Sequence, residues 1–108
     1  MNNNLWPLVG NTPLIKISEK IYAKLETYNP TGSVKDRTMG YIVNKAIRQS
    51  LITPDTTICA ATSGNTGIAI SAIAACLGLK CNIFMPVNMS EERKQMMTSY
   101  GSTIINAP

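Results

Sequence analysis

A lysine near the start of a predicted helix has the clearest chemical potential in this sequence. Lys35 lies in NPTGSVKDR, Asn29–Arg37, where turn-forming residues precede an apolar-periodic stretch. The positive end of a helix dipole disfavours an ammonium, and partial burial would disfavour it further. Both effects favour the neutral amine, the form that attacks an aldehyde. Taken singly, however, such a lysine is most often a solvated surface residue.

A second segment, TSGNTG at residues 62–67, combines two glycines with hydroxyl and amide side chains. Glycines let the backbone turn tightly and approach a ligand closely. The helix expected after them offers free backbone N–H groups, which bind carboxylates and phosphates. The segment matches neither the dinucleotide motif GxGxxG nor the P-loop. By itself it is better interpreted as a plain strand-to-helix turn.

The remaining reactive residue types narrow the chemistry. The sequence has no histidine, so acid–base work must come from Lys, Asp, Glu, Tyr or a cofactor. Cys59, Cys76 and Cys81 form no CxxC pair and lie in apolar runs. We interpret them as buried free thiols in a reducing compartment, and we expect no metal site and no disulfide.

The elements that must position these segments alternate along the chain. We expect strands over residues 21–27, 56–61, 81–85 and 103–106, and helices from Ser33 to near Ser50, over 68–77, and from Ser90 to Gly101. From residue 56 onward the order is strand–helix–strand–helix–strand. This order predicts an α/β fold with a parallel sheet and helices on both faces, and ligands at the carboxyl ends of its strands.

Two of the predicted helices have distinct apolar patterns. In the first, Ser33 is the expected N-cap, with Asp36 three residues later. Its expected buried face consists of Met39, Ile42, Val43, Ala46 and Ile47. The second, residues 68–77, is apolar on nearly every side, so we expect it to be covered all round, with Gly78 as its C-terminal stop.

Composition excludes several functional classes. The 108 residues are 44% apolar and 15% charged, which is typical of one soluble globular domain. The net charge is +4, but no run of Lys and Arg occurs, so we expect no nucleic-acid partner. The longest apolar stretch, residues 68–79, is too short for a membrane span. The start of the sequence lacks a signal-peptide pattern, and we expect a cytoplasmic protein.

Taken together, the two segments resemble a known family. NPTGSVKDR followed by TSGNTG, supported by GNTPL at 10–14, AKLE at 23–26 and MSEERK at 89–94, resembles the cysteine synthase family. This family includes cystathionine β-synthase and related β-replacement enzymes of the tryptophan-synthase-β-like fold, fold type II of the pyridoxal-phosphate enzymes. The resemblance extends from about Leu8 to Asn106.

The resemblance implies roles for particular residues. Family members hold pyridoxal phosphate as a Schiff base on the lysine that corresponds to Lys35, and this lysine also moves the substrate proton. The cofactor serves as an electron sink. By the same resemblance Asn65 bonds the cofactor's ring hydroxyl. The substrate carboxylate is held by Thr62, Ser63, Gly64, Asn65 and Thr66. The implied reaction makes cysteine from O-acetylserine and sulfide, in an enzyme that is a homodimer when complete.

Length separates this sequence from the family. We interpret residues 1–108 as a truncated N-terminal third: residues 1–35 form a lead-in, strand and lysine loop, and residues 36–108 an α/β subdomain with the substrate-carboxylate loop. The family's glycine-rich phosphate loop does not occur in it, so we expect no activity from this chain alone. Alternatives are another β-replacement enzyme, such as cystathionine β-synthase or a diaminopropionate-type synthase, and a non-catalytic remnant that binds a partner subunit or a small anion.

Overall fold

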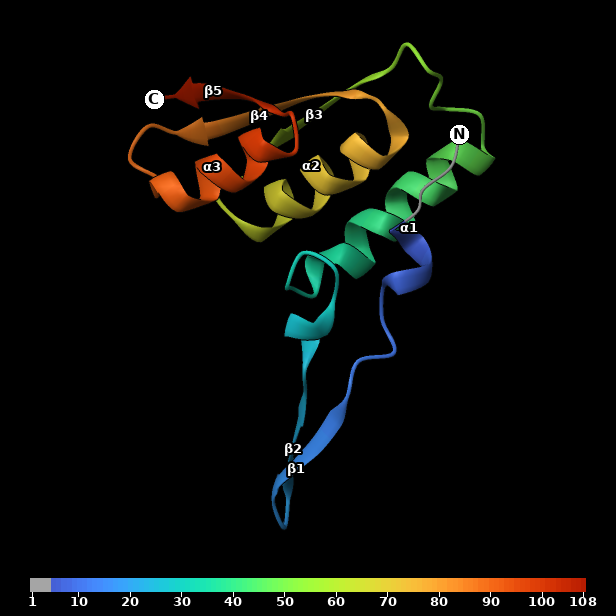
Figure 1. The fold of residues 1–108 in the computed structure, drawn as a ribbon, viewed down its shortest axis with the longest axis vertical. Coiled ribbons are helices and arrows are strands. Elements are labelled where there is room, and N and C mark those ends of the chain that lie inside the picture. Colours follow the sequence, from blue (N-terminus) through green and yellow to red (C-terminus); the bar gives the residue numbers. More distant parts are fainter. Residues whose placement is uncertain (1–4) are drawn as a thin grey trace.

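The computed structural model describes residues 5–108 as an α/β body with a projecting β-hairpin (Figure 1). In chain order the elements are η1 (Trp6–Leu8), β1 (Leu14–Ser18), β2 (Ile21–Lys24), η2 (Glu26–Tyr28), α1 (Lys35–Arg48), β3 (Thr57–Ala61), α2 (Asn65–Leu77), β4 (Lys80–Pro86), α3 (Glu91–Ser99) and β5 (Thr103–Ala107). The predicted helices and the strands of the parallel sheet are confirmed, with shifts of one to three residues at most of their ends.

Strands β3, β4 and β5 form the predicted parallel sheet, with β4 in the middle. Because both crossovers advance in the same direction across the sheet, connections of one hand place α2 and α3 on the same face. Figure 1 shows these two helices side by side beneath the strands. Among the described residues the helices therefore cover one face, whereas the sequence analysis expected them on both.

Helix α2 is the centre of the hydrophobic core. Every residue from Gly67 to Ala74 is buried, as expected for a helix that is apolar on nearly all sides. Its neighbours in the core include Val43 from α1, Ile83 and Met85 from β4, and Met97 from α3. The helix ends at Gly78, whose φ of 69° is the left-handed conformation that glycine adopts without strain.

Helix α1 buries a narrower face than its sequence predicted. Val43 is buried, and Met39 and Ile47 are partly buried against the core. Ile42 is 52% exposed, so its placement on the buried face was wrong. A residue next to Val43 lies about 100° away around the helix. Since α1 packs chiefly on α2 and not on the sheet, a narrow stripe suffices to cover the contact.

The β-hairpin is the main departure from the sequence prediction. Residues 14–18 form strand β1, which was not expected, and the strand predicted over 21–27 ends at Lys24. The two strands pair antiparallel and point away from the body (Figure 1). The radius of gyration is 15.1 Å, against about 13 Å for a compact chain of this length, because of this projection.

The uncovered face of the sheet also changes the prediction for one cysteine. Among the described residues all three cysteines are free, and Cys81 is buried and Cys76 half-buried. Cys59 is exposed, contrary to the expectation of a buried thiol. Successive residues of β3 point to opposite faces, and Cys59 lies on the face that α2 does not cover.

Replacing Gly40 with Ala tests the packing of the N-terminal segment on α1. A Cβ atom at this position would lie 2.7 Å from the ring of Trp6, which is rigid. Overpacking costs about 1–3 kcal/mol and the gain in helix propensity returns about 1, so we expect a net destabilisation of about 1 kcal/mol. Trp6 is the sole tryptophan, so its emission should shift as its ring is displaced. Thr38→Ala is the control, and a stabilised Gly40→Ala with unchanged emission would contradict this contact.

Candidate functional site

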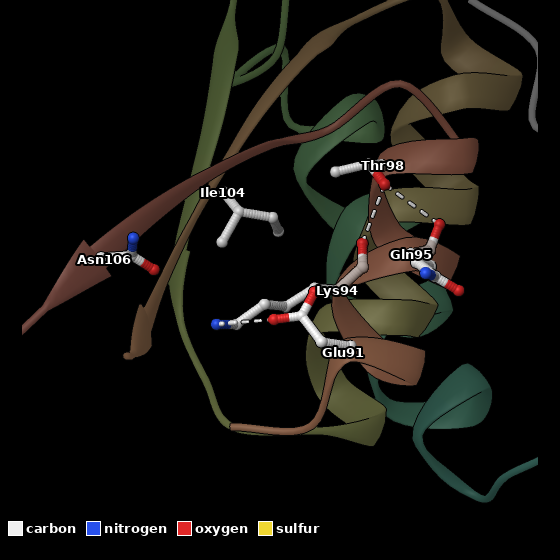
Figure 2. A pocket seen from close by; sticks show the side chains of 6 residues that line it. All are labelled: Glu91, Lys94, Gln95, Thr98, Ile104 and Asn106. Carbon is white, nitrogen blue, oxygen red and sulfur yellow. Dashed lines mark hydrogen bonds and ion pairs between the residues drawn. The ribbon is translucent and has the colours of Figure 1, made fainter. Parts of the chain in front are cut away.

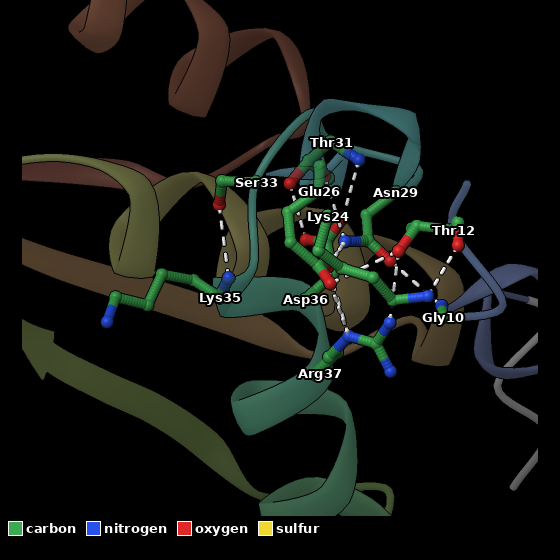
Figure 3. Close-up of polar contacts among 10 residues, drawn as sticks. All are labelled: Gly10, Thr12, Lys24, Glu26, Asn29, Thr31, Ser33, Lys35, Asp36 and Arg37. Atoms are coloured by element: carbon green, nitrogen blue, oxygen red, sulfur yellow. Dashed lines mark hydrogen bonds and ion pairs between the residues drawn. The ribbon is translucent and has the colours of Figure 1, made fainter. Parts of the chain in front are cut away.

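A polar cluster fixes the chain just before α1 (Figure 3). We use this name for Thr12, Glu26, Asn29, Asp36 and Arg37, which come from three of the motifs singled out in the sequence. The Arg37 guanidinium Nε donates to both carboxylate oxygens of Glu26, at 3.0 and 3.2 Å. The side chain of Asn29, a residue only 4% exposed, donates to the same carboxylate and accepts from the backbone N–H of Gly10 at 2.8 Å.

Asp36 closes the loop that leads into α1. Its buried carboxylate accepts hydrogen bonds from the backbone N–H and the hydroxyl of Thr31. The N-cap of α1 is Val34, not the predicted Ser33, although the Ser33 hydroxyl accepts from the N–H of Lys35 at 3.2 Å. The predicted capping pair is thus displaced, because the carboxylate reaches back five residues to Thr31 and not three to Ser33.

Lys35 is the first residue of α1, and its side chain is exposed. Figure 3 shows the side chain pointing away from the polar cluster. The partial burial expected for Lys35 is therefore not observed. Among the described residues, no hydrogen bond or ion pair involves its amine, which is free to react with a small molecule.

The segment TSGNTG continues directly from the carboxyl end of β3, as predicted. The N–H of Thr62 extends the ladder to the carbonyl of Phe84 at 3.1 Å, and its hydroxyl accepts from the N–H of Gly64 at 3.3 Å. Helix α2 begins at Asn65 and has no side-chain cap. The exposed side chains of Ser63 and Asn65 therefore stand beside backbone N–H groups that are open to an anion.

The packing of α1 on α2 relates the two predicted segments. These helices contact each other along their length and run in roughly the same direction in Figure 1. Their N-terminal ends consequently lie at the same end of the pair, with Lys35 at one and Asn65 at the other. Thr66 is half-buried at the same end. No hydrogen bond joins Lys35 to residues 62–66 in the part of the chain that the structure describes.

Sequence reasoning missed Arg93, which contacts from α3 the loop at residues 62–66, named here the anion loop for its predicted role. Its guanidinium Nη1 donates to the carbonyl of Ser63 at 3.0 Å. The MSEERK motif contains this arginine, but nothing in the sequence relates it to a residue 30 positions earlier. Only the tertiary arrangement, with α3 beside α2, brings the two together.

Three ionisable groups among the described residues have shifted pKa values, and one of them is Arg37, whose pKa is raised by its hydrogen bond to Glu26. The Arg37 hydrogen bond, with further bonds from Asn29 and Thr12, lowers the pKa of Glu26 from 4.5 to about 2. Burial raises the pKa of the Cys81 thiol, against the smaller opposing effect of hydrogen bonds from Ser102 and Ser71. Cys81 is therefore a poor nucleophile, because the thiolate is the reactive form.

A hollow of about 330 Å³ lies elsewhere, between α3 and β5 (Figure 2). Its lining consists of Glu91, Lys94, Gln95, Thr98, Ile104 and Asn106. It contains none of the predicted site residues. The Lys94 ammonium already donates to the carbonyl of Val87 at 3.1 Å and lies 3.8 Å from the carboxylate of Glu91. We therefore place the candidate site at the N-terminal ends of α1 and α2.

Two negative findings hold for residues 5–108. No group of His, Cys, Asp and Glu side chains there could hold a metal ion, and no helix is long and apolar enough to cross a membrane.

Comparison with protein-family models gives one match, described as pyridoxal-phosphate dependent enzyme, over residues 5–108. The chain belongs to this family. A curated member, cysteine synthase B of Salmonella typhimurium, is 43% identical over 110 residues, which cover 95% of this chain and 36% of that protein. The chain thus spans just over a third of the length of this relative.

Solved structures of this family share the fold of this chain. An O-acetylserine dependent cystathionine β-synthase from Helicobacter pylori superposes with a TM-score of 0.89 at 38% identity, covering 100% of this chain and 38% of its own. A hydrogen sulfide-producing enzyme from Fusobacterium nucleatum superposes with a TM-score of 0.89 at 43% identity, covering 98% and 37%. The chain therefore has the N-terminal part of the fold type II architecture, as its sequence predicted.

The described residues fit part of what pyridoxal phosphate requires. The Lys35 amine is exposed and unengaged, which suits covalent attachment to an aldehyde. The exposed amide of Asn65 can donate to a ring hydroxyl, and the N–H groups at the start of α2 suit a carboxylate. These are the residues that would hold the cofactor and its substrate in this chain.

The depressed pKa of Glu26 predicts a specific loss of stability in acid. A carboxyl whose pKa is lowered by folding stabilises the folded state above its unfolded value, and this contribution disappears as the pH falls. The junction between the hairpin and α1 should therefore loosen between pH 4.5 and about 2. Amide hydrogen exchange at Gly10, whose N–H bonds Asn29, measures the loosening.

Two substitutions make this measurement specific. Glu26→Gln should expose the Gly10 amide already at neutral pH and should remove most of the acid dependence in this interval. Glu19→Gln is the matched control, since the Glu19 side chain is 91% exposed and its carboxylate lies 3.4 Å from the Lys16 ammonium. Equal acid dependence in wild type and Glu26→Gln would show that the ion pair does not hold this junction.

Proposed function

We propose that this chain carries the lysine and the substrate-carboxylate loop of a pyridoxal-phosphate enzyme that makes cysteine from O-acetylserine and sulfide. The observation that carries this proposal is the shared end of α1 and α2. There α1 begins with a lysine whose amine is unengaged, and the uncapped N-terminus of α2 lies at the same end of the helix pair. Family membership supplies the cofactor, and similarity to cysteine synthase B supports the reaction.

In this proposal each residue has a distinct task. Thr62, Ser63, Gly64, Asn65 and Thr66 hold the substrate carboxylate through hydroxyl, amide and backbone N–H donors. Lys35 attaches the cofactor and then moves the proton at the substrate α-carbon, a task for which this sequence offers no histidine. The bound cofactor supplies the electron sink that makes this proton acidic.

A second candidate reaction is cystathionine synthesis. The solved structure from Helicobacter pylori, whose name states an O-acetylserine dependent cystathionine β-synthase, has the same fold over the whole of this chain. Both reactions begin with loss of a leaving group from the same kind of amino acid and differ in the thiol that is added. Comparing sulfide with homocysteine as the second substrate, in a protein that contains this chain and the remaining family segments, distinguishes them.

The context of the protein follows from the same proposal. We expect a homodimer in the cytoplasm when the family's full length is present, and no turnover from residues 1–108 alone. A non-catalytic chain that binds only a small anion would retain carboxylate binding but would show no selective reaction of Lys35. Selective modification of Lys35 and binding of a carboxylate therefore distinguish the enzyme from a chain that binds only an anion.

The first experiment tests the lysine. Treating the chain with a low concentration of pyridoxal phosphate, then with borohydride, makes any lysine adduct permanent for peptide mass mapping. We expect modification to concentrate at Lys35, and Lys35→Ala to abolish most of it. Lys20→Ala, which removes a lysine from the turn of the exposed hairpin, should leave the total unchanged. Uniform modification of all lysines would contradict the assignment.

The second experiment tests the loop. Ser63→Ala should weaken binding of O-acetyl-L-serine by about 1–2 kcal/mol, because one hydrogen bond to a charged group is lost. Chemical-shift titration of the backbone amides measures this binding and its position. Ser99→Ala, at the end of α3, is the control. Shifts that occur away from residues 62–66, or equal affinities for both variants, would place the carboxylate elsewhere.

A further inference from the structure

The side chain of Arg93 lies directly on the anion loop although it belongs to a different helix. Besides the bond from its Nη1 to the Ser63 carbonyl, its guanidinium packs against Gly64. A Cβ atom at Gly64 would lie 2.8 Å from Nη1 and 3.2 Å from the guanidinium carbon. A contact this short requires the arginine to move, so the absence of a side chain at Gly64 is what makes room for Arg93.

The bond to the Ser63 carbonyl fixes one peptide unit of the loop. In a trans peptide the C=O and the following N–H point in opposite directions. When Arg93 holds the Ser63 carbonyl on one side, the N–H of Gly64 is directed to the other, where it donates to the Thr62 hydroxyl at 3.3 Å. Both ends of this peptide are thus engaged, one by a residue of α3 and one within the loop.

The orientation of this peptide matters for an anion. Backbone N–H groups attract a carboxylate, whereas a carbonyl that turned toward the same region would repel it. Ser63 is exposed and Gly64 is buried. No side chain caps the start of α2, so the helix itself does not hold the loop through a cap. The engagement of the carbonyl by Arg93 therefore keeps this carbonyl from turning toward the open N–H groups at the start of α2.

We propose that Arg93 is a positioning residue for the substrate-carboxylate loop, acting by holding the Ser63–Gly64 peptide in its anion-binding orientation. The proposal rests on the function proposed for this loop. It assigns to α3 a part in substrate binding, although none of the residues predicted for the site lies on that helix. Any contribution of the arginine's charge comes in addition and can be separated from positioning by salt.

The first test uses the chain without ligand. Arg93→Met removes the donor and keeps an unbranched apolar stem. The amides of Gly64 and Asn65 should then shift, and hydrogen exchange at Gly64 should accelerate about tenfold or more. Arg93→Lys, which can still donate one hydrogen bond, should lie closer to wild type. Arg48→Met removes the same charge from the exposed end of α1 and should change neither amide.

The ligand-free result decides the structural part of the proposal without reference to function. If both Arg93→Met and Arg93→Lys leave the loop amides as they are in wild type, Arg93 does not position the loop and the proposal is overturned. The other amide resonances report whether each variant is folded. If Arg93→Met does not fold, the comparison of Arg93→Lys with wild type decides the proposal.

The second test adds O-acetyl-L-serine in low salt and in about 1 M NaCl, where the screening length falls to about 3 Å. We expect Arg93→Met to bind about tenfold more weakly than wild type in both conditions, with Arg93→Lys largely restored and Arg48→Met unaffected. If the weaker binding of Arg93→Met disappears in high salt, the arginine acts only through its charge, which would contradict positioning. If the ligand-free amides shift in Arg93→Met but wild type binds no carboxylate, positioning of the loop is supported and the proposed function is overturned instead.

Discussion

The ion pair between Glu26 and Arg37 is the interaction on which the geometry of the candidate site depends. It joins the end of the hairpin segment to the first turn of α1, and Asn29 and Thr12 bond the same carboxylate. Thr12 and Asn29 are buried and need this half-buried ion pair as a partner, because polar side chains removed from water are costly unless they are hydrogen-bonded. The backbone geometry at Lys35 thus depends on residues outside the predicted site.

The second support of the site is steric. Gly67 lies in the first turn of α2, where a Cβ atom would meet the methyl group of Thr62 at 2.6 Å and Met97 at 2.9 Å. The start of the helix is therefore packed tightly between its own loop and α3. A loop that precedes a helix buried from Gly67 to Ala74 loses little additional conformational entropy if it binds a ligand, which favours affinity.

Most of the body could be predicted from the sequence because its signals are local. The apolar run of α2, the left-handed stop at Gly78 and the β-branched run of β3 each identify their own element. Strand β1 was missed although Ile15 and Ile17 alternate with Lys16 and Ser18, because the alternation is only four residues long and no residue of the strand is buried. The displaced cap at Ser33 was missed because Asp36 bonds Thr31 instead, a local contact outside the capping-box spacing. The contact of Arg93 was missed because its partner lies 30 residues away, which spacing along the chain does not encode.

The projecting hairpin has a consequence for how the chain opens and closes. Strands β3 to β5 are joined through α2 and α3 and share one hydrophobic core with them. The hairpin meets this body through the polar cluster and the contact of Trp6 with Gly40, and both depend on α1 being in place. We therefore expect the segment that precedes α1 to open at a lower free energy than the parallel sheet, which would loosen the chain next to Lys35 while the sheet stays intact.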